Sequence, residues 1–347
     1  MKKRILTLRQ AQGENSRKRI LTGDRPTAGR FHLGNYAGKL KNTVKLQDAY
    51  ETFVPLVDLH ALTTHFDRTA ELENNIKGLM LDYLSVGLDP KKVTFYIQSK
   101  APEVLEVAYF LSTITPRSVI AKQPALKEKL DQGSQDTVAL FYYPVLMAAD
   151  ILTFKADLVP VGKDQKAHVE FAKDIAQKFN GLFGNVFTIP EPLIGGEDKT
   201  LPGTDGQEKM GKSLNNAIFL SDSNAEVEKK VMNMYTDPTR IRATDPGHVE
   251  RNPVFIYLDT FGLDNDKAQI AKYKELYRTG QVGDIEVKKY LAKILNSFLD
   301  PIRKKRAEYE SQPELVEKIL KEGTAKARAE AQKILEEVKK VMRLNYF

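Results

Sequence analysis

The chain has 347 residues, of which 41% are hydrophobic and 29% charged, as expected for a folded protein of about two domains. The absence of cysteine excludes disulfides, cysteine nucleophiles and cysteine-ligated zinc or iron–sulfur sites. The formal net charge of +7 favours a polyanionic partner such as RNA, although many basic proteins bind none. No apolar run approaches the roughly 20 residues of a membrane span, and the N-terminus lacks an apolar signal core. We therefore expect no membrane association and a cytoplasmic location.

A short repeat marks the start of the chain. The sequence KRILT at 3–7 recurs at 18–22, and the residues between the copies are polar, as in a loop or tail. Only the second copy directly precedes a turn-rich stretch. We therefore assign 18–22 to the first buried strand and residues 1–17 to an N-terminal extension.

Strand and helix signals alternate through the next two hundred residues. A helix is predicted to begin near Gly34. The later elements are strands at 52–57, 93–97 and 158–161 and helices at 69–86, 103–114, 144–152 and 166–179. Residues 117–137 are polar and irregular and predict an insertion between two halves of the sheet. This alternation predicts an α/β fold with a Rossmann-like, doubly wound parallel sheet in a catalytic domain at 18–222.

Helical patterns dominate after residue 222. Residues 283–310 and 313–343 are charged and amphipathic, and Gly323 with Thr324 predicts a break between two helices. We therefore predict a C-terminal all-helical domain at 223–347.

The first candidate motif is the turn GDRPTAGRFHLGN at 23–35, between a strand and a helix. Such a turn brings backbone N–H groups and a helix N-terminus toward phosphates. Gly34 offers no side chain to block a ligand, and His32 and Asn35 can donate hydrogen bonds to phosphate or ribose. Taken alone, the stretch fits an ordinary tight turn with a surface histidine better, since glycine-rich turns are common.

The second candidate motif is KMGKS at 209–213. Lys209 and Lys212 can meet negative charge as it moves to pyrophosphate in a transition state, although two lysines in a loop are more often simply solvated. The pair of motifs resembles the HIGH and KMSKS signatures of the class I aminoacyl-tRNA synthetases.

A third stretch, YPVLMAADILTFKADLVPVGKDQ at 143–165, suggests an amino-acid pocket. Pro144 suits the first turn of a helix on which Met147 and Asp150 share one face. A carboxylate on an apolar helix needs a partner, which is either an internal salt bridge or cap, or a polar hydrogen of a large apolar ligand. Gly162 and Asp164 follow a strand end, where ligands of open sheets bind.

The motifs AAD-IL, VPVG-x-DQ and the upstream DLHALT make the chain similar, over residues 18 to 343, to the tryptophanyl branch of this family. The resemblance assigns the tryptophan site to Asp150 for the indole N–H, to Tyr143, Met147 and Gln165 for the backbone groups of the amino acid, and to His60, Val159 and Val161 around the ring. The expected ATP-binding residues are Gly23, Arg25, Pro26, Thr27, His32, Gly34 and Asn35 in the first motif, Gly162, Lys163 and Asp164 at the nucleoside, Leu201 over the adenine, and Lys209, Met210, Gly211, Lys212 and Ser213 over the phosphates. Lys209, Lys212 and Ser213 are the expected catalytic residues.

The sequence departs from the family pattern in four places. The first turn is one residue longer, Gly211 replaces the usual serine, and the duplicated N-terminal segment has no counterpart. Residues 123–129 match poorly a segment that usually supplies an ATP-binding lysine, for which Lys127 is the positional candidate.

The resemblance implies ATP-dependent activation of L-tryptophan, with Mg²⁺ bound through the ATP phosphates and no protein cage for a metal, followed by transfer to tRNA(Trp). It also implies a homodimer and a helical domain that reads the anticodon. Two alternatives stay open: a tyrosyl-tRNA synthetase, which shares the architecture, and a non-catalytic RNA-binding paralogue.

Overall fold

The computed structural model describes residues 17–162, 165–194, 201–207, 210–211 and 214–346. Its strands are β1 (Arg19–Leu21), β2 (Glu51–Leu56), β3 (Val93–Ile97), β4 (Leu158–Pro160) and β5 (Glu191–Leu193). They form one parallel sheet in the order β3-β2-β1-β4-β5. From β1, the chain adds β2 and β3 on one side and then crosses to add β4 and β5 on the other side. This order confirms the predicted Rossmann-like, doubly wound sheet.

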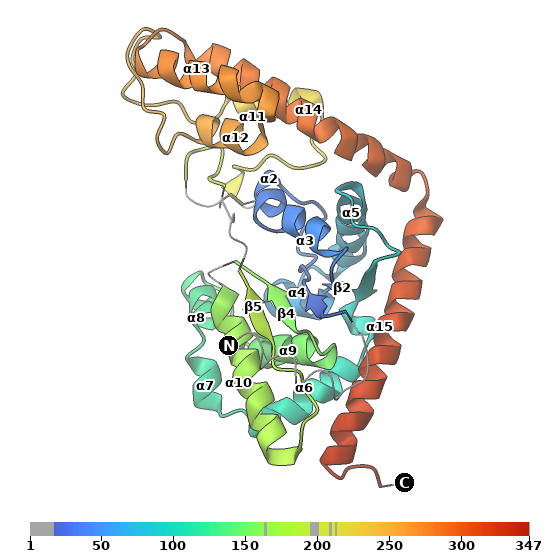
Figure 1. Cartoon of the computed structure of the whole chain (residues 1–347). Coiled ribbons are helices and arrows are strands. Elements are labelled where there is room, and N and C mark those ends of the chain that lie inside the picture. The colour runs from blue at the N-terminus through green and yellow to red at the C-terminus, as the bar shows by residue number, and fades with distance from the viewer. Residues whose placement is uncertain (1–16, 163–164, 195–200, 208–209, 212–213, 347) are drawn as a thin grey trace, which may run out of the picture.

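Helices cover both faces of the sheet (Figure 1). Those of the first two hundred residues are α2 (Leu33–Asn35), the π-helix η1 (Tyr36–Leu40), α3 (Lys41–Leu46), α4 (Asp58–His65), η2 (Thr69–Glu71), α5 (Leu72–Ser85), η3 (Gln98–Lys100), α6 (Glu103–Ile114), α7 (Arg117–Ala121), α8 (Pro124–Asp131), α9 (Val138–Thr153) and α10 (Lys166–Phe183). Successive strand residues point to opposite faces, so Phe53 packs with α6, α9 and α10 while Val54 packs with α5. Burial on both faces explains why the strands are continuous apolar runs.

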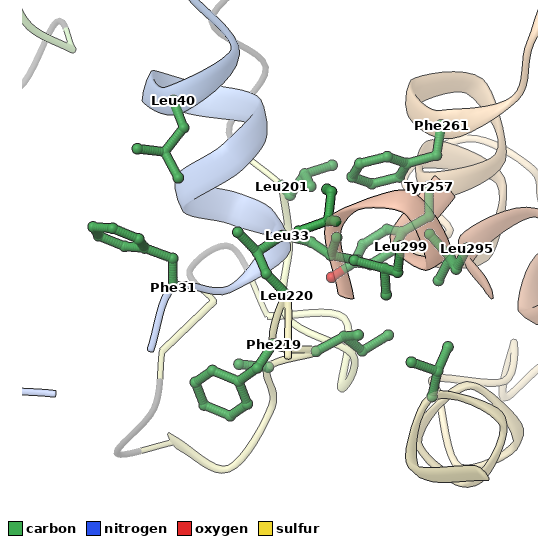
Figure 2. Packing of buried hydrophobic residues seen from close by; sticks show 14 of the residues in the cluster. Phe31, Leu33, Leu40, Leu201, Phe219, Leu220, Tyr257, Phe261, Leu295 and Leu299 are labelled. Carbon is green, nitrogen blue, oxygen red and sulfur yellow. The ribbon is translucent and has the colours of Figure 1, made fainter. Parts of the chain in front are cut away.

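The remainder of the described chain is helical, as predicted. It contains α11 (Asn224–Met232), α12 (Pro253–Phe261), η6 (Asp264–Asp266), α13 (Lys267–Arg278), α14 (Asp284–Glu310) and α15 (Pro313–Val341). Figure 1 shows α11 to α13 grouped beyond one end of the sheet, with α14 leading back from them and α15 running along the sheet. Figure 2 shows side chains from both parts of the chain, among them Leu33, Leu220 and Leu299, in one cluster. The proposed domain division at residue 222 therefore stays a prediction.

The predicted break at Gly323 and Thr324 is wrong, because α15 runs through both residues without interruption. A Cβ atom on Gly323 would lie 2.0 Å from the carbonyl oxygen of Phe95, so the glycine lets α15 lie directly on β3. The hydroxyl of Thr324 accepts a hydrogen bond from the backbone N–H of Ile97 at 3.3 Å. The pair marks the point where the helix docks on the edge strand.

Three other local predictions are corrected by the structure. Residues 117–137 contain α7 and α8, because the sequence PALKEKLD at 124–131 combines a first-turn proline with good helix formers. Helix α9 begins at Val138, so Pro144 lies inside the helix and not in its first turn. The short edge strand β5 was not predicted, since its sequence Glu-Pro-Leu carries no strand pattern. No helix in the described part of the chain is long and apolar enough to cross a membrane.

Candidate active site

A cavity of about 590 Å³ opens at the carboxyl ends of β1 and β4, where the strand order reverses. Segments that follow β1, β2 and β4 form its walls, together with α8 and α9. Ligands of open parallel sheets bind at such positions. The predicted site residues on its wall are Gly23, Arg25, His60, Tyr143, Met147, Asp150, Val159, Val161, Gly162 and Gln165. All seven residues expected around tryptophan thus line one cavity.

Asp150 is the most buried polar group of this wall, with 2% of its surface exposed. The His60 ring lies with Nε2 3.0 Å from Asp150 Oδ2, and the Gln98 amide donates to both carboxylate oxygens at 2.7 and 2.9 Å. The carboxylate therefore has the partners that a buried charge requires. Each carboxylate oxygen has two lone pairs, so Asp150 retains capacity for a further donor from the cavity.

Gln98 was not predicted as part of the site. Its Oε1 accepts from the backbone N–H of His60 at 3.4 Å, which orients the amide toward Asp150. Gln98 directly follows the end of β3, just as His60 follows the end of β2. A polar residue just past a strand end is a candidate for the site, and this criterion applies to Gln98 as well as to His60.

Tyr143 brings a second buried polar group to the wall. Its hydroxyl has no hydrogen-bond partner among the described residues. Burial raises the pKa of Tyr143 to about 12, against a smaller lowering effect from the charge of Arg25, so the hydroxyl stays protonated at neutral pH. A buried hydroxyl without a partner is costly. Its place on the cavity wall favours a bound ligand as the partner.

The first motif is held in a reciprocal cap at the start of α2. His32 Nδ1 accepts from the backbone N–H of Asn35 at 3.2 Å, and Asn35 Oδ1 accepts from the backbone N–H of His32 at 3.0 Å. Burial lowers the pKa of His32 to about 4. The ring is therefore neutral at pH 7 and carries its proton on Nε2, which remains a donor. The turn supplies one N–H donor from a neutral ring.

The end of the first motif, from His32 to Asn35, lies off the cavity wall, next to Met210 of the second motif and to residues 218–220, which follow that motif. Backbone hydrogen bonds of 2.9 Å join Leu33 N–H to the Ile218 carbonyl and Leu220 N–H to the Phe31 carbonyl. A Cβ atom on Gly34 would lie 3.0 Å from the His32 ring and 3.5 Å from Met210 Sδ. The predicted ATP residues that do not line the cavity are Pro26, Thr27, His32, Gly34, Asn35, Leu201, Met210 and Gly211.

Leu201 and Met210 are buried in the hydrophobic cluster that includes Leu33, where Figure 2 shows Leu201 beside it. An adenine bound over Leu201 would have to contact this cluster at its surface. Five predicted residues, Lys163, Asp164, Lys209, Lys212 and Ser213, lie outside the described part of the chain. Their roles stay predictions.

Two lysines on the cavity wall were not predicted. Lys39 donates to the Gly23 carbonyl and to Asp24, each at 2.6 Å, and Tyr83 also donates to Asp24. Lys129 lies in α8 with its Nζ 5.8 Å from the centre of the Tyr143 ring. Lys127 is exposed and does not line the cavity. Lys129, and not the positional candidate Lys127, therefore lines the cavity.

The comparisons with known proteins agree with this geometry. The family model described as tRNA synthetases class I (W and Y) matches residues 13–300. The tryptophan–tRNA ligase of Treponema pallidum is 49% identical over 331 residues, which cover 94% of this chain and 97% of that protein. The corresponding ligase of Streptococcus mutans is 46% identical over 336 residues, 94% of this chain and 98% of that protein.

Among solved structures, the tryptophanyl-tRNA synthetase of Campylobacter jejuni in complex with ADP and tryptophan is similar, with a TM-score of 0.84 and 35% identity. The match covers 93% of this chain and 99% of that chain. The motifs, the strand order and these relatives agree, and the chain therefore belongs to the class I tRNA synthetases of the tryptophan and tyrosine group.

Proposed function

We propose that this chain is a tryptophan–tRNA ligase, which activates L-tryptophan with ATP and transfers it to tRNA(Trp) with release of AMP and pyrophosphate. The observation that carries the proposal is Asp150, a buried carboxylate held by His60 and Gln98 on the cavity wall. The curated relatives carry this activity in their names, and the C. jejuni enzyme was solved in complex with ADP and tryptophan.

Tryptophan would enter with its indole ring between Val159, Val161 and the helix α9. Its indole N–H would donate to Asp150, whose position is set by His60 and Gln98. A site built to accept a hydrogen bond rejects ligands without the donor, because the acceptor is then left buried and unpaired. Tyr143 and Gln165 would hold the amino and carboxylate groups.

In the activation step, the tryptophan carboxylate attacks the α-phosphorus of ATP. A new P–O bond forms, the bond to the bridging α–β oxygen breaks, and pyrophosphate leaves with that electron pair. No side chain forms a covalent bond, so positioning and charge stabilisation supply the catalysis. A ribose hydroxyl of the tRNA terminus then attacks the carbonyl of the adenylate, and AMP leaves.

The phosphates would be met by donors from both motifs. His32 offers its Nε2–H, Gly34 leaves room for close approach, and Lys129 adds positive charge across the cavity. Lys209 and Lys212 are the further cations predicted from the sequence. Among the described residues, no group of three or more His, Asp or Glu side chains could hold a metal ion. Magnesium bound through the ATP phosphates would neutralise part of their charge.

The tyrosyl alternative shares the family model but has less support. The curated relatives reported above are tryptophan ligases, and the tyrosyl-tRNA synthetase of Archaeoglobus fulgidus is only 23% identical, which shows the shared fold alone. The non-catalytic alternative is opposed by the intact cap at His32 and by the assembled cavity.

We also propose that the chain acts as a homodimer. Four large apolar side chains lie exposed on α6, α7 and the start of α9, namely Leu105, Tyr109, Val119 and Val138. Val138 is 86% exposed and Tyr109 is 64% exposed. Helix α9 contacts both α6 and α7, and exposed apolar side chains on adjoining helices favour an interaction surface. The predicted anticodon-reading role of 223–347 and the cytoplasmic location stay predictions.

Pyrophosphate exchange tests the proposed activity. We expect exchange of label between pyrophosphate and ATP that depends on tryptophan and is absent with tyrosine. Exchange with tyrosine alone would support the alternative ligase. A folded protein without exchange with either amino acid would contradict both enzymes.

A further inference from the structure

The turn at His32 is joined by its backbone to residues 218–220, which follow the second motif, and the two segments form one unit. Phe31 to Leu33 pairs with Ile218 to Leu220, and the bridge between His32 and Phe219 is antiparallel. Any shift of residues 218–220 therefore moves the His32 turn. Contacts that hold this unit from outside therefore determine the position of the His32 turn.

The first outside contact is Asp82 in α5, which is fully buried. Its Oδ2 accepts from the backbone N–H of Phe31 at 2.7 Å, and its Oδ1 accepts from Arg306 of α14 at 3.0 Å. One carboxylate thus joins the residue before His32 to a helix 224 positions away in the sequence. A buried carboxylate that loses its arginine is strongly destabilised, so the two contacts are linked.

The second outside contact lies one helical turn away on α14. Arg303 donates to the Asp222 carbonyl at 2.7 Å. The Asp222 side chain accepts from the backbone N–H of Phe219 at 2.8 Å and from Lys230 at 2.6 Å. Residues three apart share one face of a helix, so α14 holds both strands of the unit with neighbouring arginines.

A third contact joins α14 to the helix that follows the turn. The rings of Tyr36 and Phe298 meet edge to face, with their centres 4.9 Å apart. None of these α14 residues lines the cavity at the sheet. Their influence on a ligand there must pass through the segments that they hold.

We propose that Asp82, Arg306 and Arg303 are positioning residues that set the His32 turn of the first ATP motif, and residues 218–220 paired with it, according to the placement of α14. The inference rests on the proposed function, in which the His32 turn handles ATP. Because α14 begins in the helical region expected to bind tRNA, the same contacts transmit a displacement of that region to the ATP side and not to the Asp150 side.

The test is the substitution Arg306→Met in the full chain. We expect the ratio kcat/KM for ATP in pyrophosphate exchange to fall by about tenfold or more, since small misplacements of binding groups are costly. The affinity for tryptophan, read from ligand fluorescence in this tryptophan-free chain, stays within about twofold. R306K, which retains the charge, restores part of the loss. The double variant R306M/D82N should have a kcat/KM for ATP within about twofold of that of R306M alone, because both substitutions break the same Asp82–Arg306 contact.

Arg328→Met is the matched control. Arg328 lies on α15 and donates at 2.8 Å to Glu103, a buried carboxylate of the sheet region that touches neither motif. R328M should leave exchange unchanged. The inference is overturned if folded R306M matches the wild type, or if the ATP and tryptophan parameters fall equally. If R306M does not fold, D82N and R303M are tested in its place, and their kcat/KM for ATP and affinity for tryptophan are compared with the wild type in the same way. A wild type without tryptophan-dependent exchange would overturn the proposed function and this inference with it.

Discussion

The two ends of the ligand site are built in different ways. At the amino-acid end, Asp150, His60 and Gln98 are all buried and bonded to one another, so the recognition group is fixed before a ligand arrives. At the ATP end, the half-buried turn at His32 is held by its own cap, by backbone pairing and by contacts from α14. Under the proposed function, selectivity would thus come from a rigid side-chain network, while phosphate handling would depend on segments positioned from a distance.

The largest expected effect is at the ATP end. Asn is a good helix cap, so His32→Asn keeps the acceptor for the Asn35 N–H but removes the Nε2–H donor. We expect kcat for pyrophosphate exchange to fall by about a hundredfold, the usual cost of one lost donor to a developing charge. Tryptophan affinity should not change. An unchanged kcat would show that this ring does not meet the phosphates.

The second prediction addresses the amino-acid end. Asp150→Ala should weaken tryptophan binding by ~1–3 kcal/mol, the cost of an unmade buried hydrogen bond. The KM for ATP should stay close to that of the wild type. Fluorescence of the bound ligand measures the affinity directly, because the chain contains no tryptophan. Wild-type affinity in this variant would refute the role assigned to Asp150.

A third variant should affect the stability of the fold but neither the ATP end nor the amino-acid end of the site. Gly323→Ala places a Cβ atom 2.0 Å from the Phe95 carbonyl oxygen, so α15 must move away from β3. We expect a loss of ~1–3 kcal/mol in the free energy of unfolding, as for other overpacked contacts. Denaturant titration measures it, and exchange by the remaining folded protein should be normal. Unchanged stability would show that the helix shifts without strain.

The smallest expected effect is the pH dependence of His32. Its folded-state pKa of about 4 lies below its unfolded value of 6.5. The neutral ring therefore contributes stability that is fully present above pH 6.5 and lost as the pH falls through about 4. We expect H32N to reduce the slope of unfolding free energy against pH in this window. An identical slope in both proteins would contradict a buried neutral ring.

Much of the fold was predictable from local patterns. The strand at 93–97 and the helix at 103–114 were predicted to the residue, because Gly87, Pro90 and Pro116 mark the ends of neighbouring elements. The short strand β5 and the interior position of Pro144 were not predictable, since tertiary packing overrides local preference at both. Gly323 was misread as a break because the sequence does not show that another backbone lies against it.

The site was predictable where one segment carries the signal. Asp150 and its neighbours on α9 and β4 were predicted, whereas Gln98 was missed because it follows β3 in a segment without a motif of its own. Lys129 lines the cavity and the positional candidate Lys127 does not, which depends on the orientation of α8 and is not visible in the sequence. Asp82 could not be predicted, because its role depends on Arg306, far away in the sequence.

The most direct measurement of the central claim is charging of tRNA in the presence of equal concentrations of tryptophan and tyrosine. The account predicts that the purified chain, given ATP and a total tRNA mixture, attaches tryptophan alone. Attachment of tyrosine, or of neither amino acid by a folded protein, would contradict it.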